Sequence, residues 1–348
     1  MTAFGRVEVS RAYFRCPACG LGDYALDARL GLEGFLGPQA RQFVCFAAAD
    51  VSFAKAQRLL EKFLGWSVCD ETIREACYRE GAAMAAWQES APEACRPFCE
   101  AAGEVEFQTD AAKVNTTGGW RDMKIGIFAK REPGEPATAE QWDERHLPGP
   151  TARLGFAAIE TSEEFGLRWR PWAGRLGVVD AGRVSVLGDG AEWIWNEAAA
   201  QFPGAAMVLD VYHAREHISD AGKALFGEGE EARRWLEDVG QALIADGWWG
   251  LCGGVGKATK EDDTPQRREA FEGLIGYFAK HTERLGYCAR LYQGRSIGSG
   301  MVEGAAKNMV GKRLKQTGAR WDVANVVRMA SLTCLAYSSI WDDYWVTV

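Results

Sequence analysis

Between residues 104 and 210, apolar residues alternate between the two-residue spacing of β-strands and the wider spacing of helices. Gly118 and Gly119 lie between the first two predicted strands, where a tight turn is expected. The predicted strands cover residues 105–110, 123–129, 154–159, 184–189 and 206–210, and the predicted helices cover 162–176 and 192–202. Strands interleaved with helices in this way predict an α/β sheet.

Two of the predicted strands end in an acidic residue, Asp110 and Asp189. Ligands gather at the carboxyl ends of strands in α/β sheets, and carboxylate oxygens are the ligands that hard divalent cations prefer. A third acid, Glu303, lies at the start of a predicted helix that follows a Gly-Ser-Gly turn. Three such carboxylates are typical of sites that hold two metal ions for phosphoryl transfer. The alternative is that each strand-end aspartate only caps a helix or forms a turn.

The rest of the sequence divides into regions with different patterns. Residues 213–293 are helical by their apolar spacing, and Thr264-Pro265 is a suitable start for one of these helices. The predicted parts are a strand with a cysteine knuckle (1–35), a helical region (36–100), the first part of the core (101–228), an all-helical insertion (229–293) and the C-terminal part of the core (294–348).

Near the N-terminus, residues 6–10 alternate as a half-buried strand does, and Cys16-Pro-Ala-Cys19 follows. Such a turn can present two thiolates to a structural zinc ion, which needs four ligands. Cys95 and Cys99 are conceivable partners, because the sequence has no second Cys-x-x-Cys motif. The alternative is a tight turn with two free thiols.

The region from 37 to 90 is predicted to be helical, with a break at Gly65 and an N-cap at Asp70. A helix–turn–helix that binds DNA is one interpretation of this pair. The other interpretation is a plain pair of packed helices, because the exposed face of the second helix mixes basic with acidic residues.

Charge is distributed unevenly along the chain. The formal net charge is −8, whereas binding to phosphate normally requires a basic surface. Between residues 290 and 328, however, eight Lys/Arg stand against two Asp/Glu. The residues of this basic stripe that we expect to contact DNA are Lys307, Lys312, Arg313, Lys315 and Arg320. The alternative is a solvated helix face.

Membrane and secretion signals are missing from the sequence. No apolar run approaches the roughly 18 residues that a membrane span needs. The first residues lack the apolar centre of a signal peptide. Ten cysteines at irregular spacing then predict reduced thiols. We therefore expect a cytoplasmic protein without a membrane partner.

Five segments resemble, in their order along the chain, the insertion-sequence transposases of the ISKra-four type, in the Mutator-like branch of the Asp-Asp-Glu transposases. They begin at Tyr13 (Tyr-Phe-Arg-Cys-Pro-Ala-Cys-Gly, with a later Leu-Gly-Leu), Gly118 (Gly-Gly-Trp-Arg-Asp-Met-Lys-Ile-Gly), Gly188 (Gly-Asp-Gly-Ala-Glu-Trp-Ile-Trp), Leu209 (Leu-Asp-Val-Tyr-His-Ala-Arg-Glu-His) and Ile297 (Ile-Gly-Ser-Gly-Met-Val-Glu, continuing at Lys312 with Lys-Arg-Leu-Lys-Gln-Thr-Gly-Ala-Arg-Trp).

The resemblance implies a ribonuclease-H-like core with a helical insertion, and it assigns Asp110, Asp189 and Glu303 as the catalytic and metal-binding triad. It implies two Mg²⁺ or Mn²⁺ ions per site. Its expected partners are the DNA of the transposon ends and target, bound by a homo-oligomer in the bacterial nucleoid. One departure is Ala111, where the family usually has glycine.

The sequence Asp210-Val-Tyr-His213 matches the Asp-x-x-His signature that Mutator-like transposases carry after the second catalytic aspartate. The resemblance places it beside the active site, where His213 would contact the scissile phosphate or orient a water molecule and Asp210 would be accessory. The alternative is that Asp210 caps a helix and His213 packs against its neighbours.

Two further functions compete with a transposase. His213-Ala-Arg-Glu216-His217 is formally the His-x-x-Glu-His motif of an inverted zinc metalloprotease. That interpretation leaves Asp110, Asp189 and the basic stripe unexplained. The other competitor is a catalytically silent, transposase-derived protein that binds DNA, although all three acids are present.

Overall fold

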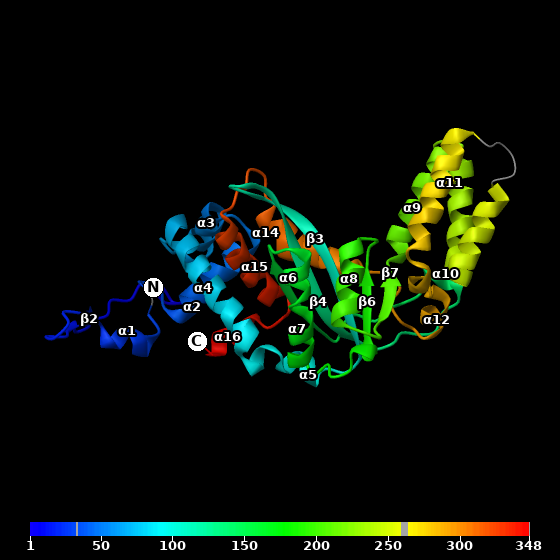
Figure 1. Cartoon of the computed structure of the whole chain (residues 1–348). Coiled ribbons are helices and arrows are strands. Elements are labelled where there is room, and N and C mark those ends of the chain that lie inside the picture. Colours follow the sequence, from blue (N-terminus) through cyan, green and yellow to red (C-terminus); the bar gives the residue numbers. More distant parts are fainter. Residues whose placement is uncertain (33, 259–263, 348) are drawn as a thin grey trace.

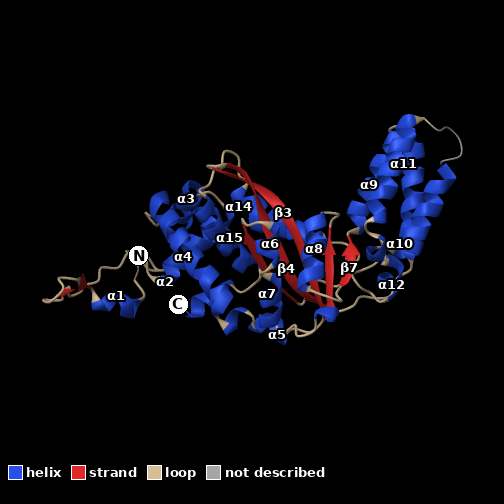
Figure 2. Ribbon diagram, viewed as in Figure 1, coloured by secondary structure: helices blue, strands red, loops and turns tan. Residues whose placement is uncertain are grey.

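The computed structural model describes residues 1–32, 34–258 and 264–347. Its centre is a mixed five-stranded sheet in the order β5-β4-β3-β6-β7 (Figures 1 and 2). The strands are β3 (Glu104–Thr116), β4 (Gly119–Arg131), β5 (Ala152–Ala158), β6 (Val184–Gly188) and β7 (Ala206–Leu209). Helices lie on both sides of the sheet, so the predicted α/β class is confirmed.

The sheet combines two kinds of strand pairing. β3, β4 and β5 form an antiparallel meander, whereas β6 and β7 run parallel to β3. The prediction that the first strand ends at Asp110 is wrong, because β3 continues to Thr116. All 13 of its residues pair with β4 across the hairpin at Gly118 and Gly119.

One face of the sheet is covered by α5 (Arg96–Glu100), α6 (Ser162–Gly166), α7 (Trp169–Arg175) and α8 (Glu192–Gln201). Aromatic side chains fill this layer; Phe107 of β3 lies 4.6 Å from both Phe128 and Trp169 between ring centroids. The single helix predicted over residues 162–176 is instead two short helices, because the chain turns at Leu167 and Arg168.

The opposite face packs against helices from both ends of the chain. They are α2 (Pro38–Asp50), α3 (Phe53–Leu64), α4 (Asp70–Ser90), α13 (Gly300–Ala305), the π-helical segment Ala306–Gly311, α14 (Lys312–Leu314), α15 (Val323–Tyr337) and α16 (Trp341–Thr347). These helices share one hydrophobic core with the sheet residues Val114, Met123 and Ile125. Cys69, and not Asp70, is the N-cap residue of α4.

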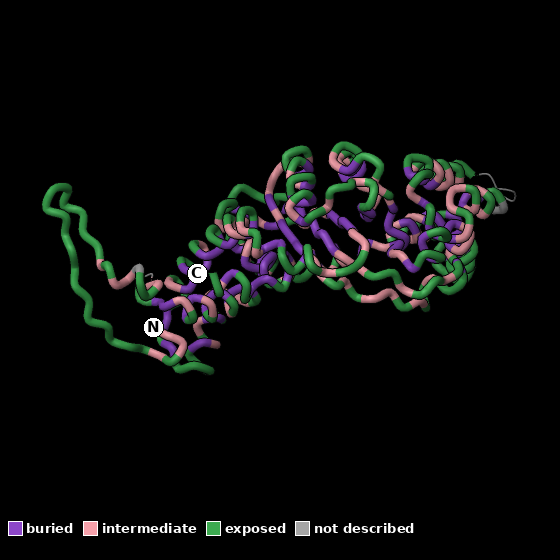
Figure 3. The backbone as a smooth tube through the Cα atoms, turned by 90° about the horizontal axis from the view of Figure 1, so that it is seen from below, coloured by how far each residue is buried: buried purple, intermediate pink, exposed green. Residues whose placement is uncertain are grey.

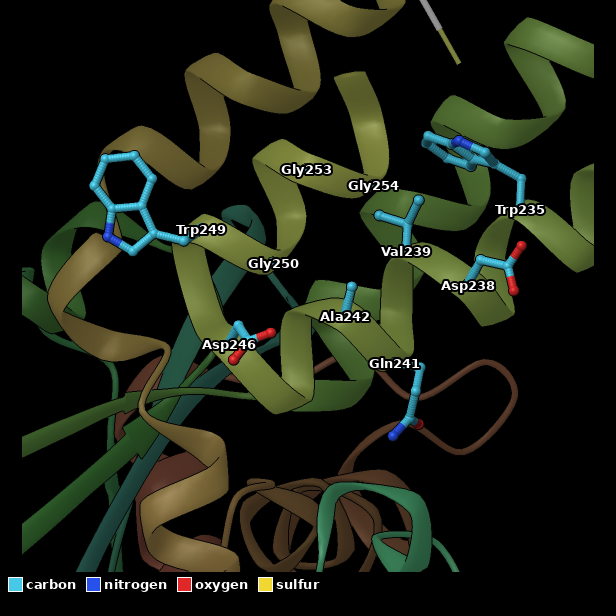
Figure 4. A pocket seen from close by; sticks show the side chains of 10 residues that line it. All are labelled: Trp235, Asp238, Val239, Gln241, Ala242, Asp246, Trp249, Gly250, Gly253 and Gly254. Carbon is cyan, nitrogen blue, oxygen red and sulfur yellow. The ribbon is translucent and has the colours of Figure 1, made fainter. Parts of the chain in front are cut away.

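Four helices stand beyond β7 at one end of the molecule (Figure 1): α9 (Val211–Phe226), α10 (Glu230–Ala258), α11 (Pro265–Ala279) and α12 (Tyr287–Tyr292). Thr264 caps α11 as predicted, since its side chain accepts a hydrogen bond from the Arg267 backbone. The chain reverses inside α10 at Gly247, whose φ of 58° favours glycine. A hollow of about 910 Å³ lies along the reversed helix, between Trp235 and Trp249 (Figure 4).

The first 30 residues form an arm that projects from the other end of the molecule and is mostly exposed (Figures 1 and 3). It contains β1 (Phe14–Arg15), β2 (Gly22–Asp23) and α1 (Ala25–Leu30). The strand predicted at residues 6–10 is absent, because this stretch runs exposed without a partner strand in the described part of the chain.

Among the residues that the structure describes, no single helix has the length and apolar character to cross a membrane. The pair α15 and α16, bent by 108°, meets that criterion by length and composition only.

Candidate active site

Asp110 and Asp189 lie at corresponding positions of two neighbouring parallel strands. Gln108 of β3 pairs with Leu187 of β6, and each aspartate follows its paired residue by two positions. Parallel strands place equivalent residues at the same end of the sheet. The two carboxylates are therefore neighbours although 79 residues separate them in the sequence.

Glu303 reaches the same end of the sheet because two contacts hold the start of α13. The backbone N–H of Val302 donates a hydrogen bond to the Gln108 side chain at 3.0 Å. The hydroxyl of Ser299 donates to Asp210 Oδ2 at 2.8 Å, and the Ser299 backbone N–H donates to the same oxygen. The helix that carries Glu303 is thereby fastened to β3 and to the beginning of α9.

These elements enclose a small pocket of about 120 Å³. The five residues that the sequence assigned to the active site all contribute to its walls. The pocket is lined by Thr109, Asp110, Asp189, Asp210, Tyr212, His213, Glu216, Ser299, Val302 and Glu303. The structure thus brings together predicted site residues that come from β3, α9, α13 and the loop after β6.

Negative charge is concentrated in this pocket. Burial raises the pKa of Asp110, and the neighbouring carboxylates of Asp189 and Glu303 raise it further. The Ala111 backbone N–H and His213 act in the opposite direction. In the described part of the chain, no salt bridge with Lys or Arg neutralises any of the three carboxylates. Such a donor set suits a divalent cation, which would relieve the repulsion.

The carboxylates of Asp110, Asp189 and Glu303 are not close enough in this structure to bind one metal ion as a group. Within residues 1–32, 34–258 and 264–347, no group of three His, Cys, Asp or Glu side chains is close enough to hold a metal ion. Asp110 and Asp189 each direct one oxygen to a nearby backbone N–H, that of Ala111 and that of Ala191. The acids would therefore have to move closer together to coordinate Mg²⁺ or Mn²⁺ as a group.

Asp210 is buried and holds two helices in place. Its Oδ1 accepts a hydrogen bond from the His213 backbone at 2.8 Å, which caps α9. Its Oδ2 binds Ser299, 89 residues further along the chain. The helix-cap interpretation of Asp210 is therefore correct, and the same carboxylate also positions the α13 segment.

His213 lies on the first turn of α9 and is partly exposed. Its Nδ1 is 3.4 Å from Glu216 Oε2, and its ring centroid is 5.1 Å from that of His217. His217 stacks on Tyr277 of α11 at 3.7 Å, and burial lowers its pKa. Among the described residues no third metal ligand joins this pair.

The basic residues after Glu303 divide into two groups. Lys307, Lys312 and Lys315 are exposed, as a contact with DNA requires. Arg313 is only 3% exposed, and the prediction that it contacts DNA is wrong. Its guanidinium donates to the Ala48 carbonyl at 2.7 Å and lies over the rings of Phe53 and Trp321.

The reason for this difference is the helical geometry, which turns Arg313 toward α2 and α3 while Lys312 and Lys315 face solvent. Arg320 is exposed, but its guanidinium donates to the carbonyl oxygens of Thr116 and Thr117 at the tip of the β3–β4 hairpin. It fastens that hairpin to the end of the basic segment.

Cys16 and Cys19 lie in an exposed turn between β1 and β2. Hydrogen bonds from the Cys19 and Ala18 backbone and from the Cys19 thiol lower the pKa of Cys16. Cys95 is buried beside α5, and the described residues supply no group of three zinc ligands. A zinc ion at Cys16 and Cys19 stays a prediction.

The sequence did not predict three residues that position or contact the side chains of the site. Gln108 and Ser299 position α13, and Tyr277 stacks against the histidine pair. Gln108 offered no clear signal in the sequence, because Glu106 and Thr109 of the same strand are also polar, and its burial (1% exposed) is seen only in the structure. Tyr277 offered none, because its contact depends on how the insertion folds back on the core.

Comparison of the chain with protein-family models and with curated proteins finds no match. The assignment of a function therefore depends on the geometry of the pocket and on the sequence motifs.

Proposed function

We propose that this protein is a DNA transposase that cleaves phosphodiester bonds and transfers DNA strands, with Asp110, Asp189 and Glu303 as its metal-binding catalytic residues. The observation that carries the proposal is that these three acids line one pocket although they are far apart in the sequence. Asp210 and His213 of the Asp-x-x-His motif line the same pocket.

The architecture adds support. An antiparallel meander followed by two parallel strands is the sheet expected of a ribonuclease-H-like core. The helices α10, α11 and α12 separate Asp189 from Glu303 in the sequence, as the predicted insertion requires. The α13 segment nevertheless returns to β3 through Gln108.

The chain's own residues would act in the reaction as follows. Bound divalent ions would activate the attacking oxygen and stabilise the leaving oxygen. Asp110, Asp189 and Glu303 would hold these ions, and His213 would contact the scissile phosphate from α9. Hydrolysis adds water across the P–O3′ bond, which leaves a 5′-phosphate and a free 3′-hydroxyl. That hydroxyl would then attack a phosphodiester of the target and release another 3′-hydroxyl.

The proposed DNA path runs from the pocket along the exposed lysines Lys307, Lys312 and Lys315. Lysine contacts with phosphate are independent of sequence and position the backbone for cleavage. We propose that the protein works as a homo-oligomer on DNA, because two transposon ends must be brought together.

The test is cleavage of a DNA fragment that contains the protein's own gene and its flanking sequences. We expect full-length protein to cut it with Mg²⁺ or Mn²⁺ and not with EDTA. Asp189→Ala and Glu303→Gln should each lower the cleavage rate by at least 100-fold while DNA binding persists, because only the metal ligands change.

Glu231→Ala is the matched control, since Glu231 is an exposed acid in the first turn of α10. It should cleave at the wild-type rate. Metal-independent cutting, or substantial cutting by Asp189→Ala, would refute the assignment. Binding to the fragment without any cutting would favour the silent DNA-binding alternative.

A further inference from the structure

Tyr277 connects the helical insertion to the pocket. It lies on α11, and its ring stacks on His217 with 3.7 Å between centroids and 23° between planes. His217 in turn lies 5.1 Å from His213, which lines the pocket. The Tyr277 ring is also 5.0 Å from the ring of the buried His281. The Tyr277 ring therefore contacts both His217 and His281.

The hydroxyl of Tyr277 is directed at the turn that follows Asp189. A Cβ atom added to Gly190 would lie 2.3 Å from Tyr277 Oη and 2.6 Å from Cε2, so only glycine fits there. The carboxylates of Asp189 and Asp210 are also close enough to raise the pKa of Tyr277, although burial is the larger cause. The hydroxyl thus lies against Gly190, the residue that follows Asp189, which is one of the proposed metal ligands.

This hydroxyl is buried and has no hydrogen-bond partner in the described part of the chain. A buried donor without a partner is costly, and such exceptions call for a functional explanation. Asp189 has a matching free acceptor: its Oδ1 accepts from the Ala191 backbone, whereas no described residue donates to its Oδ2. The three acids must also move closer together before they can bind a metal ion as a group.

We propose that Tyr277 is a positioning residue whose hydroxyl donates a hydrogen bond to the Asp189 carboxylate when the three acids close around a divalent cation. This inference rests on the proposed function, because it takes Asp189 as a metal ligand. Through Tyr277, the helical insertion would contribute directly to the metal-binding site. Partners of this kind orient a ligating carboxylate and raise the affinity for the metal.

The test compares Mn²⁺ binding and metal-free stability of full-length variants without DNA. Tyr277→Phe keeps the ring that stacks on His217 and removes only the hydroxyl. We expect its Mn²⁺ affinity, measured by titration calorimetry, to fall about tenfold, as is typical for partners of metal ligands. Its melting temperature in EDTA should equal or exceed that of the wild type, because an unpaired buried group is removed.

Tyr292→Phe is the matched control, since Tyr292 is an exposed tyrosine at the end of α12 in the same insertion. It should bind Mn²⁺ like the wild type. Tyr277→Leu, which also removes the ring, should lower both the Mn²⁺ affinity and the melting temperature.

The outcomes separate this inference from the proposed function. Equal Mn²⁺ affinity of Tyr277→Phe and wild type would overturn the role of Tyr277 and leave the transposase proposal intact. A tenfold loss of affinity in a protein that never cleaves DNA would support the role of Tyr277 and count against the transposase. A wild-type protein that binds no Mn²⁺ would overturn both.

Discussion

At the scale of single residues, the pocket brings together negatively charged carboxylates that do not stabilise the fold. Asp110 is partly buried beside Asp189 and Glu303, and no basic side chain in the described part of the chain pairs with it. Proteins that concentrate unpaired like charges in this way sacrifice stability at functional sites. Stability measurements can therefore detect the site independently of any reaction.

Asp110→Asn should stabilise the metal-free protein at pH 7. The pKa of Asp110 is higher in the folded chain than its ordinary value of 3.8 in the unfolded chain. Ionisation of Asp110 therefore lowers the free energy of unfolding as the pH rises above 3.8. Asparagine cannot ionise, and we expect a gain of about 0.5–1 kcal/mol at pH 7. The gain should shrink as the pH falls toward 4. Thermal melting in EDTA over this pH range measures it, and a less stable variant at pH 7 would contradict the explanation.

The charge of Arg313, unlike that of the pocket acids, stabilises the fold. Its side chain is buried and its guanidinium has partners. Arg313→Ala removes the donor to the Ala48 carbonyl and the cation that lies over Phe53 and Trp321. We expect a loss of about 2–4 kcal/mol in the free energy of unfolding. Urea denaturation measures this loss. The neighbouring exposed Lys312→Ala should stay within about 0.5 kcal/mol of wild type, and equal effects of the two changes would show that Arg313 has no such role.

At the scale of elements, the segment from α13 to α14 combines the site with the proposed DNA path. It begins as α13 with Glu303 and continues as the π-helical segment Ala306–Gly311. Short π-helical stretches are uncommon and frequently occur at functional sites. Here the stretch follows Glu303 and contains Lys307, the first lysine of the proposed DNA path.

Replacing Lys307, Lys312 and Lys315 together by alanine should weaken binding to cognate and unrelated DNA equally. Removing one lysine–phosphate interaction should lower the slope of log K against log salt by about 0.9, and removing all three should lower it by roughly 2.7. Binding measured by fluorescence anisotropy at several salt concentrations gives the slope. Substituting Lys280, Arg233 and Arg234, exposed residues of the insertion, is the control. An unchanged slope in the lysine variant would place the DNA path elsewhere.

The elements also show what sequence reasoning can recover. All five predicted core strands and the helix after Asp189 exist, because apolar periodicity reports burial directly. The end of β3 was missed, since its last residues are paired with β4 in a hairpin that extends past the neighbouring strand β6. The orientation of Arg313 was missed for a related reason: charge in a sequence says nothing about which way a helix faces its neighbours.

At the scale of the whole molecule, the N-terminal helices and the last helices form one core. Gly81 of α4 packs so closely on α15 that an added Cβ would lie 2.2 Å from the Arg328 carbonyl oxygen. The three acids were predictable from motif and strand position. Gln108 and Ser299, which hold α13, and Tyr277, which we propose to position Asp189, were not, because each contacts a segment far away in the sequence.

The bond between Asp210 and Ser299 has a consequence for how the protein is made. Ser299, Glu303 and α15 all follow the helical insertion in the sequence. While the ribosome is still producing the insertion, Asp210 has no Ser299 to hold, and the wall of the pocket that carries Glu303 does not exist. A growing chain, or one that ends prematurely, therefore carries only two of the three acids. The pocket can be completed only after the segment that contains Ser299 and Glu303 has been synthesised.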